Sequence, residues 1–142
     1  MTSCRIRAFA DSDREAVVTP WRNCGLVVPW NDPDKDIDNK LAVDRDLFLV
    51  ALDSDGLVAT VMGGYEGHRG WINYLAVNPE KRGLGYGKRM MSSVETRLKS
   101  KGCPKINLQV RSSNAEVVAF YRTLGYTIDA VVSLGKRLDK PE

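Results

Sequence analysis

The segment that most constrains the fold runs from Leu75 to Arg89, where an apolar stretch passes through a basic, glycine-rich loop into an amphipathic helix. Three alternating glycines and four cations make up the loop: Gly83, Gly85, Gly87, Lys81, Arg82, Lys88 and Arg89. Glycine lets the backbone turn so that several N–H groups face one point, and the start of a helix adds partial positive charge. The segment therefore predicts a strand–loop–helix unit whose loop binds an anion such as a pyrophosphate.

Two common phosphate-binding patterns do not fit this loop. A Walker A loop would need a glycine where Arg82 stands and a hydroxyl side chain where Arg89 stands. A dinucleotide fingerprint, GxGxxG, starting at Gly83 would need a glycine where Lys88 stands. The residues of the loop thus exclude both nucleotide-binding motifs but keep the prediction of an anion site.

Patterns typical of strands and helices alternate along the chain. Apolar runs or alternation predict strands over residues 4–9, 47–52, 57–64, 71–77, 106–110, 126–132 and 133–138. Caps and helical periodicity predict helices from residue 12, over 37–43, from 88 to about 101 and over 114–124. Pro20 is expected to kink or end the first helix, whereas Asp32 and Pro33 suit an N-cap and a first helical position. These elements predict an α/β (α+β) fold, and the length predicts a single domain over residues 1–142.

Composition narrows the class of protein further. A chain with 43% hydrophobic and 27% charged residues is typical of globular domains, and a net charge of +3 is too small to predict a nucleic-acid partner. The three cysteines form no CxxC pair and His68 is the single histidine, so no metal site is expected. The sequence has neither a signal-peptide pattern nor a long apolar run, and we expect a cytoplasmic protein with no membrane partner.

The glycine loop matches a known family pattern. Arg82-x-x-Gly85-x-Gly87 fits R/Q-x-x-G-x-G/A and resembles the loop with which N-acetyltransferases of the GNAT superfamily bind the pyrophosphate of acetyl-coenzyme A. Residues 75–79 resemble the fourth strand of that superfamily, and residues 110–126 resemble its second signature. The latter stretch is closest to RimI-type enzymes. Three other stretches resemble the small bacterial YpeA-type branch: residues 29–33, 62–70 and 134–138.

The resemblance implies a fold, an activity and a cosubstrate. GNAT proteins have a central, mixed, mostly antiparallel sheet of about six to seven strands, flanked by about four helices and splayed between strands four and five. They transfer an acetyl group from acetyl-CoA to an amine by direct attack on the thioester. By resemblance the acetyl-CoA-binding residues would be Leu75, Ala76, Val77, Arg82, Gly83, Leu84, Gly85, Tyr86, Gly87, Lys88, Asn114 and Tyr121.

The resemblance also provides candidates for proton transfer. Tyr121 matches the family tyrosine beside the CoA sulfur and would be the general acid, since a phenol with a pKa near 10 is protonated at neutral pH. RimI-type enzymes carry a glutamate on the fifth strand where this chain has Gln109, which cannot accept a proton. Glu66 and His68, in the turn before the fourth strand, are candidate bases, and a water chain is the alternative.

The acceptor is left open by the sequence. In the GNAT superfamily the loop between the first two helices covers the acceptor site, so Trp30, Asn31 and Asp32 are candidate substrate-binding residues. The amine-bearing partner can be a peptide N-terminus, a lysine, a polyamine, an amino acid or an antibiotic. Dimers are common in the superfamily, and a homodimer is one expectation here.

Other interpretations of the same residues stay open. Tyr121 can be an ordinary packing residue, and Asn114 can serve as a helix cap. The domain can also be a non-catalytic sensor that binds acyl-CoA without turnover, which the replacement at Gln109 favours and the retained Tyr121 opposes. A nucleic-acid binder that uses the basic loop is disfavoured by the low net charge and by the lack of a ladder of stacking aromatic residues.

Overall fold

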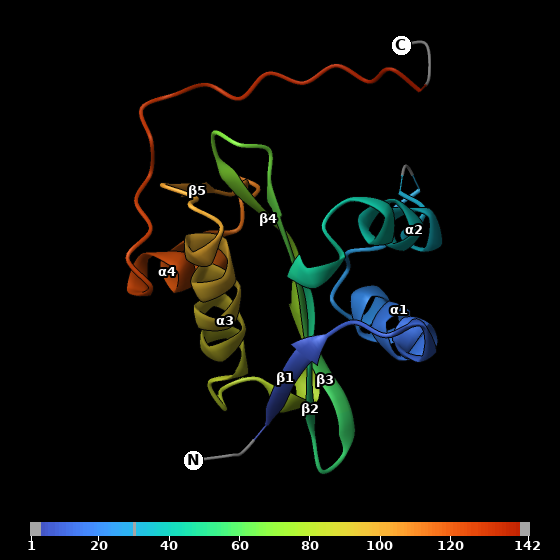
Figure 1. Ribbon diagram of the computed structural model, residues 1–142. Helices are drawn as coiled ribbons and strands as arrows, with labels where there is room; N and C mark the ends of the chain where they lie inside the picture. The colour runs from blue at the N-terminus through green and yellow to red at the C-terminus, as the bar shows by residue number, and fades with distance from the viewer. Residues whose placement is uncertain (1–3, 30, 140–142) are drawn as a thin grey trace. The chain divides into compact units, whose positions relative to one another are not determined.

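The computed structural model describes residues 4–29 and 31–139 (Figure 1). The chain divides into two compact units, residues 1–109 and residues 110–142. The first unit contains the sheet and three of the α-helices, and the second contains one α-helix. The prediction of a single domain stays a prediction.

The first unit is built on a sheet in the order β1-β2-β3-β4-β5. Its strands are β1 (Arg5–Ala8), β2 (Phe48–Asp53), β3 (Gly56–Tyr65), β4 (Gly70–Val77) and β5 (Ile106–Asn107). The first four strands pair antiparallel, whereas β5 runs parallel to β4. The predicted mixed, mostly antiparallel sheet is therefore confirmed, but the described residues form five strands rather than six to seven.

Helices cover both faces of this sheet, with α1 (Arg14–Asn23) and α2 (Pro33–Val43) on one side and α3 (Tyr86–Ser100) on the other (Figure 1). On the α1 face, the Trp21 ring stacks on Tyr74 with a centroid distance of 4.0 Å, and its Nε1 donates to Thr60 Oγ1 at 2.8 Å. On the α3 face, a Cβ built on Gly63 would lie 2.6 Å from Val94 Cγ2. The sheet thus lies between two packed layers, and α3 approaches β3 so closely that only glycine fits.

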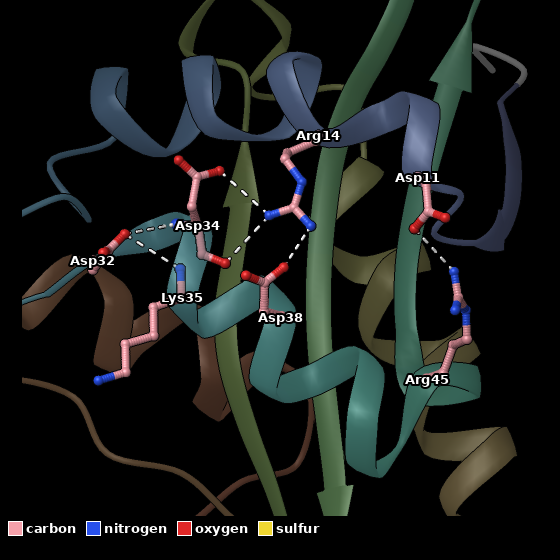
Figure 2. Close-up of polar contacts among 7 residues, drawn as sticks. All are labelled: Asp11, Arg14, Asp32, Asp34, Lys35, Asp38 and Arg45. Carbon is pink, nitrogen blue, oxygen red and sulfur yellow. Dashed lines mark hydrogen bonds and ion pairs between the residues drawn. The ribbon is translucent and has the colours of Figure 1, made fainter.

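Polar contacts fix the start of α2 and its position beside α1. The Asp32 carboxylate accepts from the backbone N–H groups of Asp34 and Lys35, at 3.1 and 3.3 Å, which confirms the predicted N-cap. The guanidinium of Arg14, on α1, pairs with Asp34 at 3.4 Å and with Asp38 at 2.7 Å (Figure 2). Exposed pairs of this kind contribute at most about 1 kcal/mol each, so they set the orientation of α2 more than they stabilise it.

Pro20 lies inside α1, so the expectation that it would end the first helix is wrong, and the alternative, a kink, stays a prediction. A proline in a helix removes the N–H that would donate to the carbonyl four residues earlier, here that of Ala16. Ala16 is exposed, so water can satisfy that carbonyl, while the buried Pro20 ring adds to the apolar face of the helix.

The second unit contains α4 (Ala115–Thr123), which matches the expected helix. Asn114 is its N-cap, and Gly125, with φ 94°, follows the last turn in the left-handed conformation. The predicted strands over residues 126–132 and 133–138 are wrong, since the described residues 126–139 contain no strand. Alternating apolar residues favour a strand only when a neighbouring strand takes up the backbone hydrogen bonds. The apolar residues of this stretch, Ile128 and Val132 among them, are exposed.

Candidate active site

A bulge in the middle of β4 is the first unusual feature of the site. The register of β3 against β4 shifts between Thr60 and Met62, which pair with Ala76 and Asn73, so that two residues of β4 oppose a single residue of β3. The first of the two, Tyr74, has φ 52°, which is rare and costly for a bulky side chain. Thr60 Oγ1 donates to the Tyr74 carbonyl at 2.9 Å and helps to hold this conformation.

Beyond the bulge, β4 offers an unpaired edge. β5 pairs with β4 only through Gly70 and Trp71, so the residues of β4 after Trp71 have no strand on that side in the described part of this unit. The Asn78 N–H donates to the Val58 carbonyl at 2.8 Å, and antiparallel geometry then turns the Leu75 carbonyl and both backbone groups of Val77 away from β3. Two predicted cofactor-binding residues, Leu75 and Val77, therefore present polar backbone groups at this edge.

Some backbone groups near this edge already have partners within the protein. Ala76, also predicted to bind the cofactor, is buried and lies opposite Thr60, so its backbone groups face β3. The Val77 carbonyl accepts from the Cys24 thiol at 3.3 Å. Cys24 follows the last residue of α1, so the end of α1 lies beside the open edge.

The glycine loop joins β4 to α3 and ends in a helix start without a side-chain cap. Gly83 and Gly85 have φ values of 82° and 85°, and Gly85 is the N-cap. A Cβ on either glycine would meet no atom within 4 Å, so the left-handed backbone, and not crowding, requires glycine there. The first N–H groups of the helix, from Tyr86 to Lys88, have no carbonyl partner within the helix and carry its positive dipole. This arrangement suits an anion such as a pyrophosphate.

The four cations of the loop differ in what they contact. Lys81 pairs with Asp53 at 3.2 Å and with Asp55 at a shorter distance, and these two carboxylates raise the pKa of Lys81 to about 12. The Arg89 guanidinium donates to the Cys4 carbonyl at 3.0 Å. Arg82 and Lys88 are exposed at the start of the helix, and Arg82 also donates to Cys24 Sγ at 3.7 Å. These two exposed cations are better candidate phosphate ligands than Lys81, which two carboxylates hold.

Two further predicted cofactor-binding residues of the loop have contrasting environments. The Tyr86 side chain is buried, and its hydroxyl donates to Asp53 Oδ2 at 2.9 Å. Burial and the Asp53 carboxylate raise the pKa of Tyr86. Tyr86 therefore anchors the helix start and can contact a ligand only through its backbone, whereas the Leu84 side chain is exposed at the tip of the loop.

A pocket of about 620 Å³ opens on the other face of the sheet, between α2 and the ends of β3 and β4. α2 lines the pocket with Asp36, Asn39, Lys40 and Val43, a spacing that puts these four side chains on one face of the helix. Lys40 Nζ donates to the Gly63 carbonyl and lies 3.9 Å from Asp44. Burial lowers the pKa of Lys40, and the neighbouring carboxylate opposes this change.

The strands supply the aromatic wall of the same pocket. Tyr65, Trp71 and Tyr74 all line it, and Trp71 is 40% exposed. The Tyr74 hydroxyl donates to Asp36 Oδ2 across the pocket. Burial and the Asp36 carboxylate both raise the pKa of Tyr74, so this phenol stays protonated and donates.

The predicted acceptor and base residues are only partly brought together. Asn31 and Glu66 line the pocket, whereas His68 is exposed and does not line it. Glu66 Oε1 accepts from the backbone N–H groups of His68, at 3.1 Å, and of Arg69. The Asp32 carboxylate is engaged as the cap of α2, and Trp30 lies outside the described residues.

No sequence motif singles out Asp36 or Lys40, which both line the pocket. A signal was present, because a polar stripe at residues 36, 39 and 40 lies next to the buried Ile37. Such stripes are common on exposed helices, and the pocket wall contributed by β4 cannot be inferred from α2 alone.

In the second unit, Tyr121 is only 8% exposed and packs edge-on against Phe120 and Tyr126, with centroid distances of 5.2 and 5.6 Å. Burial raises the pKa of Tyr121 to about 12, so its hydroxyl stays protonated at neutral pH. The Asn114 side chain accepts from the Val117 N–H at 3.4 Å, as the cap interpretation expects. Gln109, expected on the fifth strand, follows β5, which ends at Asn107.

The fold is shared with solved acetyltransferases. The chain resembles Ard1 from Thermoplasma volcanium with a TM-score of 0.81 and 22% identity, covering 91% of this chain and 86% of that one. It also resembles the ribosomal-protein-S18-alanine N-acetyltransferase of Escherichia coli, with a TM-score of 0.71 and 19% identity over 87% of this chain and 77% of that one. At such identities the likeness defines the fold.

Sequence comparison gives the family. The Acetyltransferase (GNAT) family matches residues 15–126. An acetyltransferase of Yersinia enterocolitica is 47% identical over 133 residues, and one of Sodalis glossinidius is 49% identical over 134 residues, each covering 94% of both chains. The chain belongs to the GNAT family of acetyltransferases and is an acyltransferase.

The described residues were compared with the requirements of a metal site and of a membrane-spanning helix. Within residues 4–29 and 31–139, no group of three or more His, Cys, Asp or Glu side chains could hold a metal ion. No helix in the same ranges has the length and apolar character needed to cross a membrane.

Proposed function

We propose that the protein transfers the acetyl group of acetyl-CoA to a primary amine by direct attack on the thioester. The observation that carries the proposal is the combination of an open β4 edge with a glycine-capped helix start one loop later. The polar backbone groups of Leu75 and Val77 suit the amide-containing pantetheine arm, and the N-terminal amides of α3 suit the pyrophosphate. Arg82 and Lys88 supply positive charge beside it.

The proposed reaction balances in atoms and charge. A protonated amine loses one proton and its nitrogen attacks the thioester carbonyl carbon. The carbon–sulfur bond then breaks and CoA leaves with the electron pair. The new amide nitrogen releases a second proton, and the leaving thiolate takes up one proton to become the thiol. In this scheme the protonated Tyr121 hydroxyl donates to the departing sulfur, and Asn114 contacts the pantetheine arm.

A base for the amine is proposed from the pocket. Gln109 stands where RimI-type enzymes carry a glutamate, and an amide cannot accept the proton. Of the two candidate bases in the turn before β4, Glu66 lines the pocket, whereas His68 does not. We therefore favour Glu66, directly or through water, over His68.

The first test is ligand-dependent thermal stability with acetyl-CoA, CoA, ATP and NAD in parallel. A ligand present at about a hundred times its dissociation constant stabilises the folded protein by about 2.7 kcal/mol. For a domain of this size that corresponds to a rise in Tm of roughly 5–10 °C. We expect the rise with the two CoA species alone. No rise with CoA, or a larger one with ATP, would contradict the proposed cofactor site.

The second candidate function is an acyl-CoA sensor without turnover, which the glutamine at position 109 favours. Release of CoA thiol in the presence of any amine separates the two functions, since a sensor would bind acetyl-CoA without releasing thiol. The expected cytoplasmic location, the homodimer and the absence of a nucleic-acid partner stay predictions.

A further inference from the structure

The carboxylates of the α2 region have different partners. Asp34 and Asp38 pair with Arg14, and Asp32 caps the helix (Figure 2). Asp44 lies 3.9 Å from Lys40. Asp36 is the exception, because in the described part of the chain it pairs with no cation and accepts only from the neutral Tyr74 hydroxyl.

The position of Asp36 makes this exception costly. Its side chain is half-buried and lines the pocket, so part of its hydration is lost. Lys40 lines the same pocket one helical turn away, but it pairs with Asp44 and donates to the Gly63 carbonyl. One hydroxyl occupies Oδ2, and a carboxylate can accept several more hydrogen bonds. A cationic ligand in the pocket would supply both the missing charge and the missing donors.

Tyr74 ties this carboxylate to the proposed reaction centre. The residue after Tyr74 is Leu75, whose carbonyl faces the open edge assigned to the pantetheine arm. The Tyr74 backbone has an unusual positive φ, and its ring is stacked on Trp21. The hydroxyl that donates to Asp36 is therefore fixed in place. Asp36 therefore lies next to the bulge of β4, on the face of the sheet where the pocket opens.

We propose that Asp36 binds the protonated amine of the acceptor, that Tyr74 positions Asp36, and that the acceptors are small amines without a carboxylate beside the amino group. This inference rests on the proposed acetyl transfer and names the substrate class for it. Trp71 and Tyr65, on the pocket wall, offer an apolar and cation-attracting surface to the carbon stem of the amine. A carboxylate next to the amino group would meet Asp36 and be repelled.

Binding, and not deprotonation, is the role assigned to Asp36. A carboxylate holds an ammonium through charge-assisted hydrogen bonds, and Asp36 has a free oxygen to accept them. The proton then leaves by way of Glu66 or water.

The test compares 2-phenylethylamine with phenylalanine, which has the same skeleton with a carboxylate added. With saturating acetyl-CoA, we expect 2-phenylethylamine to be the better acceptor by kcat/KM. Asp36→Asn should raise the KM for 2-phenylethylamine by about ten- to a hundredfold and change kcat much less. The ratio of kcat/KM for 2-phenylethylamine to that for phenylalanine should fall. Asp36→Glu should restore part of the affinity, and Tyr74→Phe should raise KM by less than Asp36→Asn.

Asp38→Asn is the matched control, since it makes the same change on the same helix in a residue paired with Arg14. Its KM for 2-phenylethylamine should equal that of the wild type. An unchanged KM in Asp36→Asn, or an equal rise in Asp38→Asn, overturns the inference.

A measurement without acetyl-CoA separates this inference from the proposed function. 2-Phenylethylamine alone should raise the Tm of the wild type and of Asp38→Asn, but not that of Asp36→Asn. If the amine stabilises the wild type in this way and no thiol is released, acetyl transfer fails while the amine site stands. If CoA binds but 2-phenylethylamine neither stabilises the protein nor is acetylated, the amine site is wrong.

Discussion

The glycine loop before α3 and the pocket beside α2 belong to the same unit. The residues that form the loop are neighbours in the sequence, whereas those that form the pocket are far apart in it. The loop takes its shape from neighbouring residues, since Gly83 and Gly85 set the backbone and the helix that follows sets the direction of the N–H groups. The pocket depends on a contact between Asp36 and Tyr74, which are 38 residues apart. Binding of an anion needs little more than a local turn, whereas recognition of an amine needs two elements brought together by the fold.

This difference predicts how each region responds to change. A substitution in the loop should act on one ligand and leave the pocket intact, because the loop backbone is its own scaffold. A substitution in the pocket should act through contacts between α2 and β4.

Tyr121→Phe should affect chemistry without affecting either binding region. Loss of the donor to the departing thiolate is expected to lower kcat by about a hundredfold, at the low end for general acids because a thiol with a pKa near 8.5 is already a good leaving group. The KM for acetyl-CoA should stay within about twofold of the wild type, since the phenyl ring keeps the packing against Phe120 and Tyr126. Steady-state kinetics with thiol detection measures both quantities, and an unchanged kcat would contradict the general-acid role.

Gly85→Ala and Gly102→Ala test whether the loop binds the anion through its backbone. The two glycines lie just outside opposite ends of α3, with φ values of 85° and 87°, and a Cβ at either would meet no atom within 4 Å. Both substitutions should therefore cost about 1–2 kcal/mol of stability from backbone strain. Only Gly85→Ala should weaken CoA binding, by about tenfold, because only its backbone shapes the N-terminal amides. Equal losses of CoA affinity in a titration would show that the effect is one of stability alone.

Gly63→Ala and Gly64→Ala compare the two faces of the sheet at adjacent positions of β3. A methyl group at Gly63 would lie 2.6 Å from Val94 on α3, and this overpacking should cost about 1–3 kcal/mol. A methyl group at Gly64 would lie 3.5 Å from Lys40 Nζ, an ordinary contact, and stability should change by less than about 1 kcal/mol. Urea unfolding measures both values, and similar losses would mean that the α2 face is packed as tightly as the α3 face.

Much of the fold follows from the sequence because its signals are local. The apolar runs predict β2, β3 and β4 to within about two residues, and the Asp32–Pro33 pair predicts the start of α2. The proline rule alone does not predict that α1 continues past Pro20, because Pro20 is buried and Ala16, four residues earlier, is exposed to water. The alternation after Tyr126 predicts strands that the described residues do not form, because no local pattern supplies a partner strand.

The candidate site also combines features that the sequence predicts with features that it does not. The motif from Arg82 to Gly87 predicts an anion-binding loop. It does not predict that two carboxylates hold Lys81 or that the Tyr86 side chain is buried. The roles of Tyr121 and Asn114 stay predictions from the resemblance. The polar stripe at residues 36, 39 and 40 includes Asp36, but the sequence does not show that this carboxylate, rather than Asp34 or Asp38, lines a pocket.

The family, the elements from β1 to α4 and the glycine-rich loop before α3 all follow from the sequence. Periodicity, caps and glycine conformation act within a few residues, so they are written in adjacent letters. Distant contacts decide that Asp36 lines the pocket and that Tyr74 donates to it, and they leave the edge of β4 beyond Trp71 open in the described part of its unit. These features arise from the pairing of distant segments, and the free energy of such contacts depends on neighbours that no local stretch of the chain specifies.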